Sequence, residues 1–129
     1  MAADPAAPHP PVRRVEKPWG YEIWFAVTER YAGKLIHIGA GHELSLQFHR
    51  QKDESIYVVA GAMELELEDD AGAIQTHQLR PGDCQHIPVG RRHRMRALVD
   101  TDICEVSTPE LDDVVRLEDR YGRVADPGS

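Results

Sequence analysis

Two stretches decide the fold, GHELSLQFHRQKDESIYVVAG at residues 41–61 and GDCQHIPVGRRH at residues 82–93. Gln47 and His49 are two positions apart, so on a strand both side chains share one face, with Cα atoms about 6.6 Å apart. A four-residue turn then returns the chain to Glu54 on the next strand, and such a hairpin converges three donors on one point. The second stretch is a strand, a Pro-Gly turn and a histidine. Gln47, His49 and Glu54 are therefore candidate ligands of one metal ion, and His93 is a further potential donor.

Short strand signals fill the rest of the chain. Residues 63–68 alternate glutamate with methionine or leucine in strict period two, which is typical of a strand with one buried face. The other expected strands are residues 21–26, 34–38, 44–48, 55–60, 76–79, 85–88, 93–98 and 102–107. Turns rich in Gly, Pro and Asp separate them at even intervals, which indicates a β-sandwich or barrel. Residues 111–117 are expected to form one short helical turn.

Composition limits the function classes. The chain has 129 residues, enough for one domain, and 41% of them are apolar. Its longest apolar runs, such as residues 56–60, are too short to span a bilayer, and residues 1–11 lack the basic and apolar regions of a secretory signal. We therefore expect a cytoplasmic protein without a membrane partner. The net charge of −7 argues against a nucleic-acid partner.

The chain has two cysteines, Cys84 and Cys104, and they form no CxxC motif. We expect both to be reduced thiols in a cytosolic protein. A disulfide between neighbouring strands is the alternative.

Both opening stretches resemble the paired motifs of the cupin family. Gly41 and Gly61 stand at the expected offsets from the donors in the first motif, with Gln47 in place of its first histidine. In the second, Gly82 begins the pattern that ends at His93, and Ala97 replaces the family's closing asparagine. The resemblance implies an all-β cupin (jelly-roll-like) β-barrel as a single domain at residues 13–124. Flexible tails are expected at residues 1–12 and 125–129.

The cupin donor set fits one divalent metal ion. An amide oxygen, two imidazoles and a carboxylate suit zinc, which we expect first, and also iron, manganese, cobalt or nickel. Four protein ligands leave room for water or substrate oxygens.

Three further stretches resemble the cupin domain of type II phosphomannose isomerases. They are residues 17–22 (KPWGYE), residues 44–49 (LSLQFH, including the glutamine) and residues 112–123. No stretch resembles the nucleotidyltransferase domain that precedes this cupin in the family, so we expect a stand-alone cupin. Lys52 and Arg116 match a lysine and a catalytic arginine of the type I enzymes.

These resemblances imply a sugar-phosphate isomerase that interconverts mannose 6-phosphate and fructose 6-phosphate. Lys52 is expected to transfer the proton if its pKa is lowered, and Arg116 to hold the developing charge or the phosphate. Arg91 and Arg92, in the turn before His93, are expected to meet the anionic substrate. The alternatives are a cupin oxygenase or lyase acting on a small metabolite, and a non-catalytic cupin that binds a sugar or metabolite.

A homodimer is expected as well. Tyr57 and Val59 should face away from the barrel interior that holds Glu54, and they are apolar enough to be covered by a second copy.

Overall fold

The computed structural model describes residues 6–125, and the predicted tail residues 1–5 and 126–129 lie outside them. Residues 6–12 contain no strand and are exposed. The strands are β1 (Arg13–Lys17), β2 (Gly20–Val27), β3 (Ala32–Ile38), β4 (Leu46–Phe48), β5 (Glu54–Ala60), β6 (Met63–Glu68), β7 (Ile74–Leu79), β8 (Cys84–Ile87), β9 (His93–Ala97), β10 (Thr101–Ser107) and β11 (Val115–Glu118). A 3-10 helix, η1 (Arg123–Ala125), follows β11, and among residues 6–125 no helix is long and apolar enough to cross a membrane.

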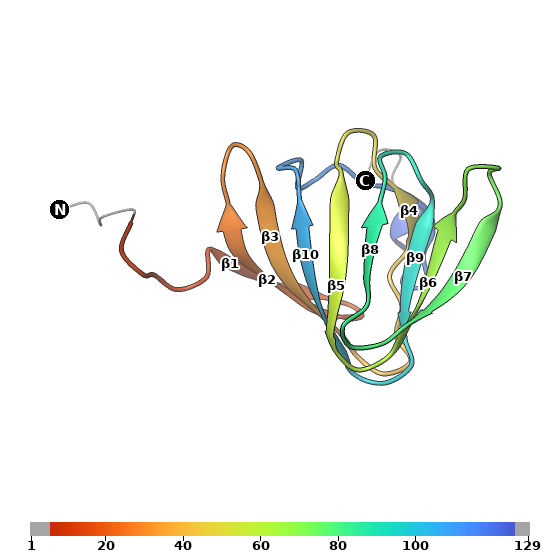
Figure 1. The fold of residues 1–129 in the computed structure, drawn as a ribbon, viewed down its shortest axis with the longest axis horizontal. Helices are drawn as coiled ribbons and strands as arrows, with labels where there is room; N and C mark the ends of the chain where they lie inside the picture. Colours follow the sequence, from red (N-terminus) through yellow and green to blue (C-terminus); the bar gives the residue numbers. More distant parts are fainter. Residues whose placement is uncertain (1–5, 126–129) are drawn as a thin grey trace.

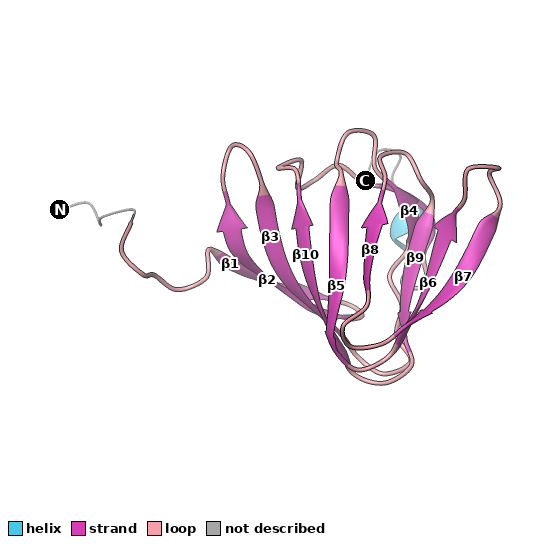
Figure 2. Cartoon of the chain, viewed as in Figure 1, coloured by secondary structure: helices cyan, strands magenta, loops and turns pink. Residues whose placement is uncertain are grey.

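The strands form two antiparallel sheets that enclose one interior (Figure 1). The six-stranded sheet has the order β1-β2-β3-β10-β5-β8, and the five-stranded sheet has the order β11-β4-β9-β6-β7. Figure 2 shows the strand-dominated chain with its one short helical turn near the C-terminal end. The predicted all-β, barrel-like fold is confirmed.

Alternation along the strands builds the core. Met63, Leu65 and Leu67 of β6 point inward and are buried, while the glutamates between them lie at the surface. Arg94 of β9 lies outward and pairs with Glu66 across the sheet. Period-two patterning therefore identified both faces of this sheet correctly, because each strand has one side toward the core and one toward solvent.

Gly61, the last glycine of the first motif, directly follows β5 and has a φ of 95°. A side chain there would also overlap the backbone carbonyl of Asp100. The position therefore requires glycine both for its backbone conformation and for the close approach of another strand.

Two sequence expectations need correction. The segment expected to be helical at residues 111–117 instead forms a turn and then β11, which pairs with β4 through Arg116 and Gln47. Two consecutive valines disfavour a helix here, and the open edge of β4 offers backbone partners. Strand β1 was not predicted either, and it pairs with β2 at the edge of the six-stranded sheet.

The alternative of a disulfide between neighbouring strands is excluded. Cys104 and Cys84 are each in register with Tyr57, one on either side of β5, and both are free. Two strand spacings place their Cα atoms about 9.5 Å apart, beyond the span of a disulfide.

Candidate metal centre

Three strand ends bring the predicted donors together. His49 directly follows β4, Glu54 begins β5 and His93 begins β9, with Gln47 in register opposite His93. His49, Glu54 and His93 are 4%, 2% and 1% exposed. Their ligand atoms all lie within 4.8 Å of one another.

The donor spacing suits a metal ion. Glu54 Oε1 lies 3.0 Å from His49 Nε2 and 3.2 Å from His93 Nε2. Metal–ligand bonds of about 2.0–2.2 Å would separate adjacent ligands by about 3.0–3.5 Å in octahedral or tetrahedral geometry. The trio therefore needs little rearrangement to coordinate one ion.

Backbone carbonyls orient both imidazoles. His49 Nδ1 lies 2.5 Å from the carbonyl oxygen of Asp113, and His93 Nδ1 lies 2.9 Å from that of Arg91. Since a carbonyl oxygen only accepts, each Nδ1 carries the proton and each Nε2 presents a lone pair in the neutral ring. Metal-binding histidines are commonly fixed in this way.

Without a cation, this arrangement leaves polar atoms unsatisfied. His93 Nε2 is buried and has no hydrogen-bond partner among the described residues, and Glu54 Oε2, also buried without a hydrogen bond, has only its ion pair with Lys52 at 3.4 Å. Two imidazole lone pairs facing one carboxylate oxygen repel it unless a cation or protons intervene. The residues therefore fit a divalent metal by spacing, tautomer and donor chemistry.

Charged residues surround Glu54. Burial disfavours its charged form, but a hydrogen bond with Glu105 and the charge of Lys52 hold the pKa of Glu54 well below its usual range, and the imidazoles would add to this only as Nε2–H donors, the tautomer that the backbone carbonyls oppose. Burial and then repulsion from Glu54 raise the pKa of Glu105. One negative charge is therefore concentrated on the candidate ligand.

Lys52 lies between these two carboxylates. Its Nζ is 3.4 Å from Glu54 and 3.3 Å from Glu105. Burial lowers the pKa of Lys52, but the carboxylates outweigh burial and raise it above the usual value. In the metal-free site Lys52 is an ammonium group, the opposite of the lowered pKa on which its role as a base was predicted.

Gln47, the predicted fourth ligand, shares a cavity with His49. Its Oε1 accepts a hydrogen bond of 2.6 Å from the hydroxyl of Ser45. A carbonyl oxygen has a second lone pair, so this bond orients the amide and leaves acceptor capacity. Coordination by Gln47 stays a prediction.

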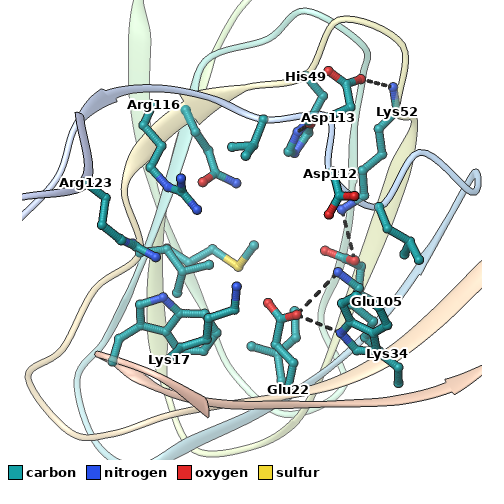
Figure 3. Close-up of a pocket in the computed structure, with 18 residues that line it drawn as sticks. Lys17, Glu22, Lys34, His49, Lys52, Glu105, Asp112, Asp113, Arg116 and Arg123 are labelled. Carbon is teal, nitrogen blue, oxygen red and sulfur yellow. Dashed lines mark hydrogen bonds and ion pairs between the residues drawn. The ribbon is translucent and has the colours of Figure 1, made fainter. Parts of the chain in front are cut away.

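A cavity of about 380 Å³ opens beside the donors (Figure 3). This volume is in the range of small-molecule sites. The barrel strands contribute Glu22, Trp24, Lys34 and Glu105, and the segment at residues 111–123 closes another wall with Asp112, Asp113, Arg116 and Arg123. In Figure 3, Arg116 and Arg123 lie on one side of the cavity and Lys52 and Glu105 on the other.

The side formed by Arg116, Arg123 and Lys17 carries excess positive charge. Burial and then repulsion from Arg123 lower the pKa of Arg116. The pKa of Lys17 is also lowered, by burial and by the neighbouring cations, against the attraction of Glu22. Arg123 pairs with Asp119 at 2.8 Å, whereas Arg116 Nε is buried with no hydrogen-bond partner among residues 6–125.

Arg91 and Arg92 do not line this cavity. Arg91 pairs with Asp70 at 2.5 Å, and Arg92 lies 3.4 Å from Glu68. These contacts hold both guanidinium groups at the β6–β7 turn, so the structure brings together the other predicted site residues but not these two.

Charged cavity residues that the sequence prediction missed include Lys17, Glu22, Lys34 and Glu105 on the barrel strands, and Asp112, Asp113 and Arg123 in the C-terminal segment. In β2, the stretch Glu22-Ile23-Trp24 places the glutamate inward, where Lys34 pairs with it at 3.4 Å. A charged residue in an alternating strand normally indicates the solvent face. The sequence did carry a signal for Glu105, because Glu105 lies an even number of positions from the apolar Ile103 of the same strand, so both side chains point to the same face.

Comparison with known proteins agrees with this geometry. The cupin domain family matches residues 34–108, which include every predicted metal donor. The chain belongs to the cupin family. It is 35% identical, over 129 aligned residues, to the mannose-1-phosphate guanylyltransferase ManC of Salmonella typhimurium, covering 96% of this chain and 26% of that protein. The alginate biosynthesis protein AlgA of Pseudomonas aeruginosa is 32% identical over 118 residues, or 88% of this chain and 24% of AlgA.

This cupin thus spans about a quarter of the length of these curated relatives. The resemblance to the cupin domain of type II phosphomannose isomerases is confirmed. Among solved structures, KdgF from a Halomonas species is 28% identical with a TM-score of 0.66, covering 74% of this chain and 84% of KdgF. Oxalate decarboxylase from Bacillus subtilis shares the fold at 18% identity and a TM-score of 0.72, covering 81% of this chain and 30% of that one.

Proposed function

We propose that this cupin is a metal-dependent isomerase of a phosphorylated sugar, of the type that interconverts mannose 6-phosphate and fructose 6-phosphate. The observation that carries the proposal is the divided cavity. The histidine and glutamate donors and a Lys–Glu pair occupy one side, and Arg116, in register with Gln47 across β4 and β11, presents an unpartnered buried nitrogen on the other. A ligand that matches both sides has an anionic end and, a few bonds away, oxygens that can bind a metal.

The donor set supports a divalent ion held by His49, Glu54, His93 and Gln47, with zinc as our first expectation. When bound, such an ion polarises the carbonyl and hydroxyl oxygens of adjacent carbons, which eases removal of the proton between them. Nδ1–H bonds to backbone carbonyls keep both imidazoles in the ligating tautomer. The partly enclosed cavity limits access of water to the reacting carbons.

Lys52 remains our proposal for proton transfer. Glu54 and Glu105 both raise its pKa, and engagement of Glu54 as a ligand would remove much of the attraction of that carboxylate. Lys52 and Glu105, 3.3 Å apart, can then share the proton that moves between the two substrate carbons.

Arg116 and Lys17 are proposed to bind the phosphate. A guanidinium donates paired hydrogen bonds to phosphate oxygens, and an ammonium adds a point charge. The lowered pKa values of both groups reflect burial together with the crowding of positive charge, which a bound anion would relieve. We assign the anionic end to this wall and not to Arg91 and Arg92, whose charges are already paired.

The relatives' names support a role in sugar-phosphate chemistry, since one acts on mannose 1-phosphate and others serve alginate and xanthan biosynthesis. Because the chain spans only a quarter of these proteins, their whole activity is not transferred to it. The second candidate function is a non-catalytic sugar-phosphate receptor. The short span of the match favours it as well, since in the relatives the part that this chain does not match could carry the catalytic activity. A cytoplasmic location also stays a prediction.

A turnover assay tests the proposal. The protein is loaded with zinc, cobalt or manganese and assayed on mannose 6-phosphate and a panel of aldose phosphates, with Gln47→Ala and His93→Ala as controls. We expect turnover that requires the metal and falls at least a hundredfold in His93→Ala. A metal-loaded protein that turns over no member of the panel contradicts the isomerase. Sugar-phosphate binding without turnover indicates the receptor, and oxygen uptake by a ferrous form indicates a cupin oxygenase.

A homodimer is also part of the proposal. Tyr57 and Val59 lie on the outer face of the six-stranded sheet, 49% and 50% exposed, beside the exposed Leu35 and Val106. Contiguous apolar side chains on a sheet face favour cover by another protein surface. Light scattering should give a dimer mass that falls to the monomer in Tyr57→Glu, and a wild-type monomer at micromolar concentration contradicts it.

A further inference from the structure

Asp113 makes an unusual number of contacts with the loop that carries the metal donors. Its carboxylate accepts three backbone N–H groups, from Arg50 at 3.0 Å, Gln51 at 2.7 Å and Lys52 at 2.9 Å. Its backbone carbonyl accepts the Nδ1–H of His49 at 2.5 Å. Four consecutive residues of the loop are therefore tied to one aspartate, and Figure 3 shows Asp113 beside His49 and Lys52.

These contacts join two parts of the chain that are more than sixty residues apart. Asp113 lies beyond residues 34–108, the segment that matches the cupin domain family. Two residues later β11 begins, and it is fixed on β4 by pairing of Val115 with Phe48 and of Arg116 with Gln47. The position of Asp113 is therefore set by the same strand pair that positions the predicted ligand Gln47 and the phosphate-binding candidate Arg116.

The loop between His49 and Glu54 is held at its ends by hydrogen bonds between His49 and Gly90 and between Asp53 and both Thr108 and His86, whereas the N–H groups of residues 50–52 all donate to Asp113. It contains no strand, and Arg50, Gln51 and Asp53 are exposed. Yet it holds Lys52, 5% exposed, between Glu54 and Glu105. A carboxylate that accepts consecutive backbone N–H groups fixes the path of such a loop, because charge-assisted hydrogen bonds are short and directional.

We propose that Asp113 is a positioning residue that presets the metal ligand His49 and the cavity residue Lys52 together. Its carbonyl fixes the imidazole tautomer and ring plane, and its carboxylate fixes the backbone between the two side chains. The C-terminal segment thereby becomes part of the metal site without supplying a ligand. This inference rests on the metal site of the proposed function but not on the isomerase reaction.

The chain offers a matched control in Asp69. The Oδ1 atom of Asp69 accepts the backbone N–H groups of Ala71 and Ala73, both at 2.9 Å, in the β6–β7 turn. Asp69→Ala therefore removes the same kind of loop cap at a site that does not line the cavity. Any effect of losing a turn cap on general stability appears in both variants.

The test compares wild type, Asp113→Ala, Asp113→Asn and Asp69→Ala in the full chain. Titration of the apo-protein with Co²⁺, followed by visible absorption, measures metal affinity, and amide hydrogen exchange reports on residues 50–52. We expect Asp113→Ala to weaken Co²⁺ binding at least tenfold, as loss of a group that supports a ligand does. It should also lose protection at the three amides. Asp113→Asn keeps one acceptor oxygen and should lose about threefold in affinity.

Asp69→Ala should bind Co²⁺ within twofold of wild type while losing protection at residues 71 and 73. If Asp113→Ala binds Co²⁺ as tightly as wild type, the inference is overturned while the metal site and the proposed function stand. If the alanine variant does not fold, the same result in Asp113→Asn overturns it. A wild type that binds no Co²⁺ removes the metal site and the inference with it. A wild type that binds Co²⁺ but does not isomerise sugar phosphates affects only the proposed reaction.

Discussion

Replacement of Arg116 by methionine should raise stability and weaken ligand binding at once. In the ligand-free protein the Nε of Arg116 is buried with no hydrogen-bond partner among the described residues, and Arg123 repels its charge. A buried donor without a partner costs about 1–3 kcal/mol, and methionine keeps much of the aliphatic packing. Because the guanidinium is only partly buried, we take the lower end, a gain of about 1 kcal/mol in the free energy of unfolding.

Binding should change in the opposite direction. A hydrogen bond to a charged group contributes about 1.5–3 kcal/mol, which corresponds to about 10- to 150-fold in affinity. Calorimetric titration with mannose 6-phosphate should therefore show at least a tenfold weaker complex for Arg116→Met. A gain of about 1 kcal/mol should raise the melting temperature by roughly 3–6 °C in a domain of this size.

The controls separate this effect from general damage. Co²⁺ affinity should stay within about twofold of wild type, because Arg116 is paired with Gln47 through the backbones of β11 and β4, which methionine leaves in place. A variant that loses stability and binds the sugar phosphate as tightly as wild type would refute the reasoning. Arg116 would then be a structural residue of β11, and the phosphate would have to bind elsewhere.

Three further predictions concern the buried charges. Glu54→Gln removes the only anion between the two imidazoles of the donor trio and should weaken Co²⁺ binding at least a hundredfold in the same absorption titration. Lys34→Met leaves Glu22, 3.4 Å away in the wild type, as an unpaired buried carboxylate. Urea unfolding should show that the free energy of unfolding falls by about 3 kcal/mol and that adding Glu22→Gln restores most of it. An unchanged unfolding midpoint in Lys34→Met would contradict the pairing. Burial raises the pKa of Glu22, but Lys34 and the Trp24 indole outweigh burial and lower it below its usual 4.5. The folded state thus gains stability from this group above pH 4.5 and loses it as the pH falls below that value. Glu22→Gln should flatten this acid limb in unfolding measurements between pH 3 and 6, and an identical limb in both proteins would count against it.

The donor trio could be predicted from sequence because its geometry is local. His49 and Glu54 belong to one hairpin, so their spacing alone fixes which face they share. His93 needed the second motif, whose offsets place a histidine at the start of a strand. Its approach to Glu54 within 3.2 Å depends on the tertiary fold.

The substrate side of the cavity could not be predicted in the same way. Its cations come from β1, β11 and η1, and neither edge strand carries a clear periodic signal in four or five residues. Arg116 was singled out only through resemblance, and Asp113 was not singled out at all. The hydrogen bonds of Asp113 with residues 49–52 depend on the pairing of β11 with β4, which the expected helical turn at residues 111–117 would have prevented.

The most direct test of the account is a crystal structure of the zinc-loaded protein with anomalous data collected at the zinc absorption edge. The account predicts one strong peak per chain, about 2.0–2.2 Å from His49 Nε2, His93 Nε2, a Glu54 carboxylate oxygen and Gln47 Oε1. The peak should vanish in crystals of Glu54→Gln grown under the same conditions. No peak at this point in the wild type, or a zinc ion bound only at surface histidines, would contradict the central claim that this cupin is built around a metal ion.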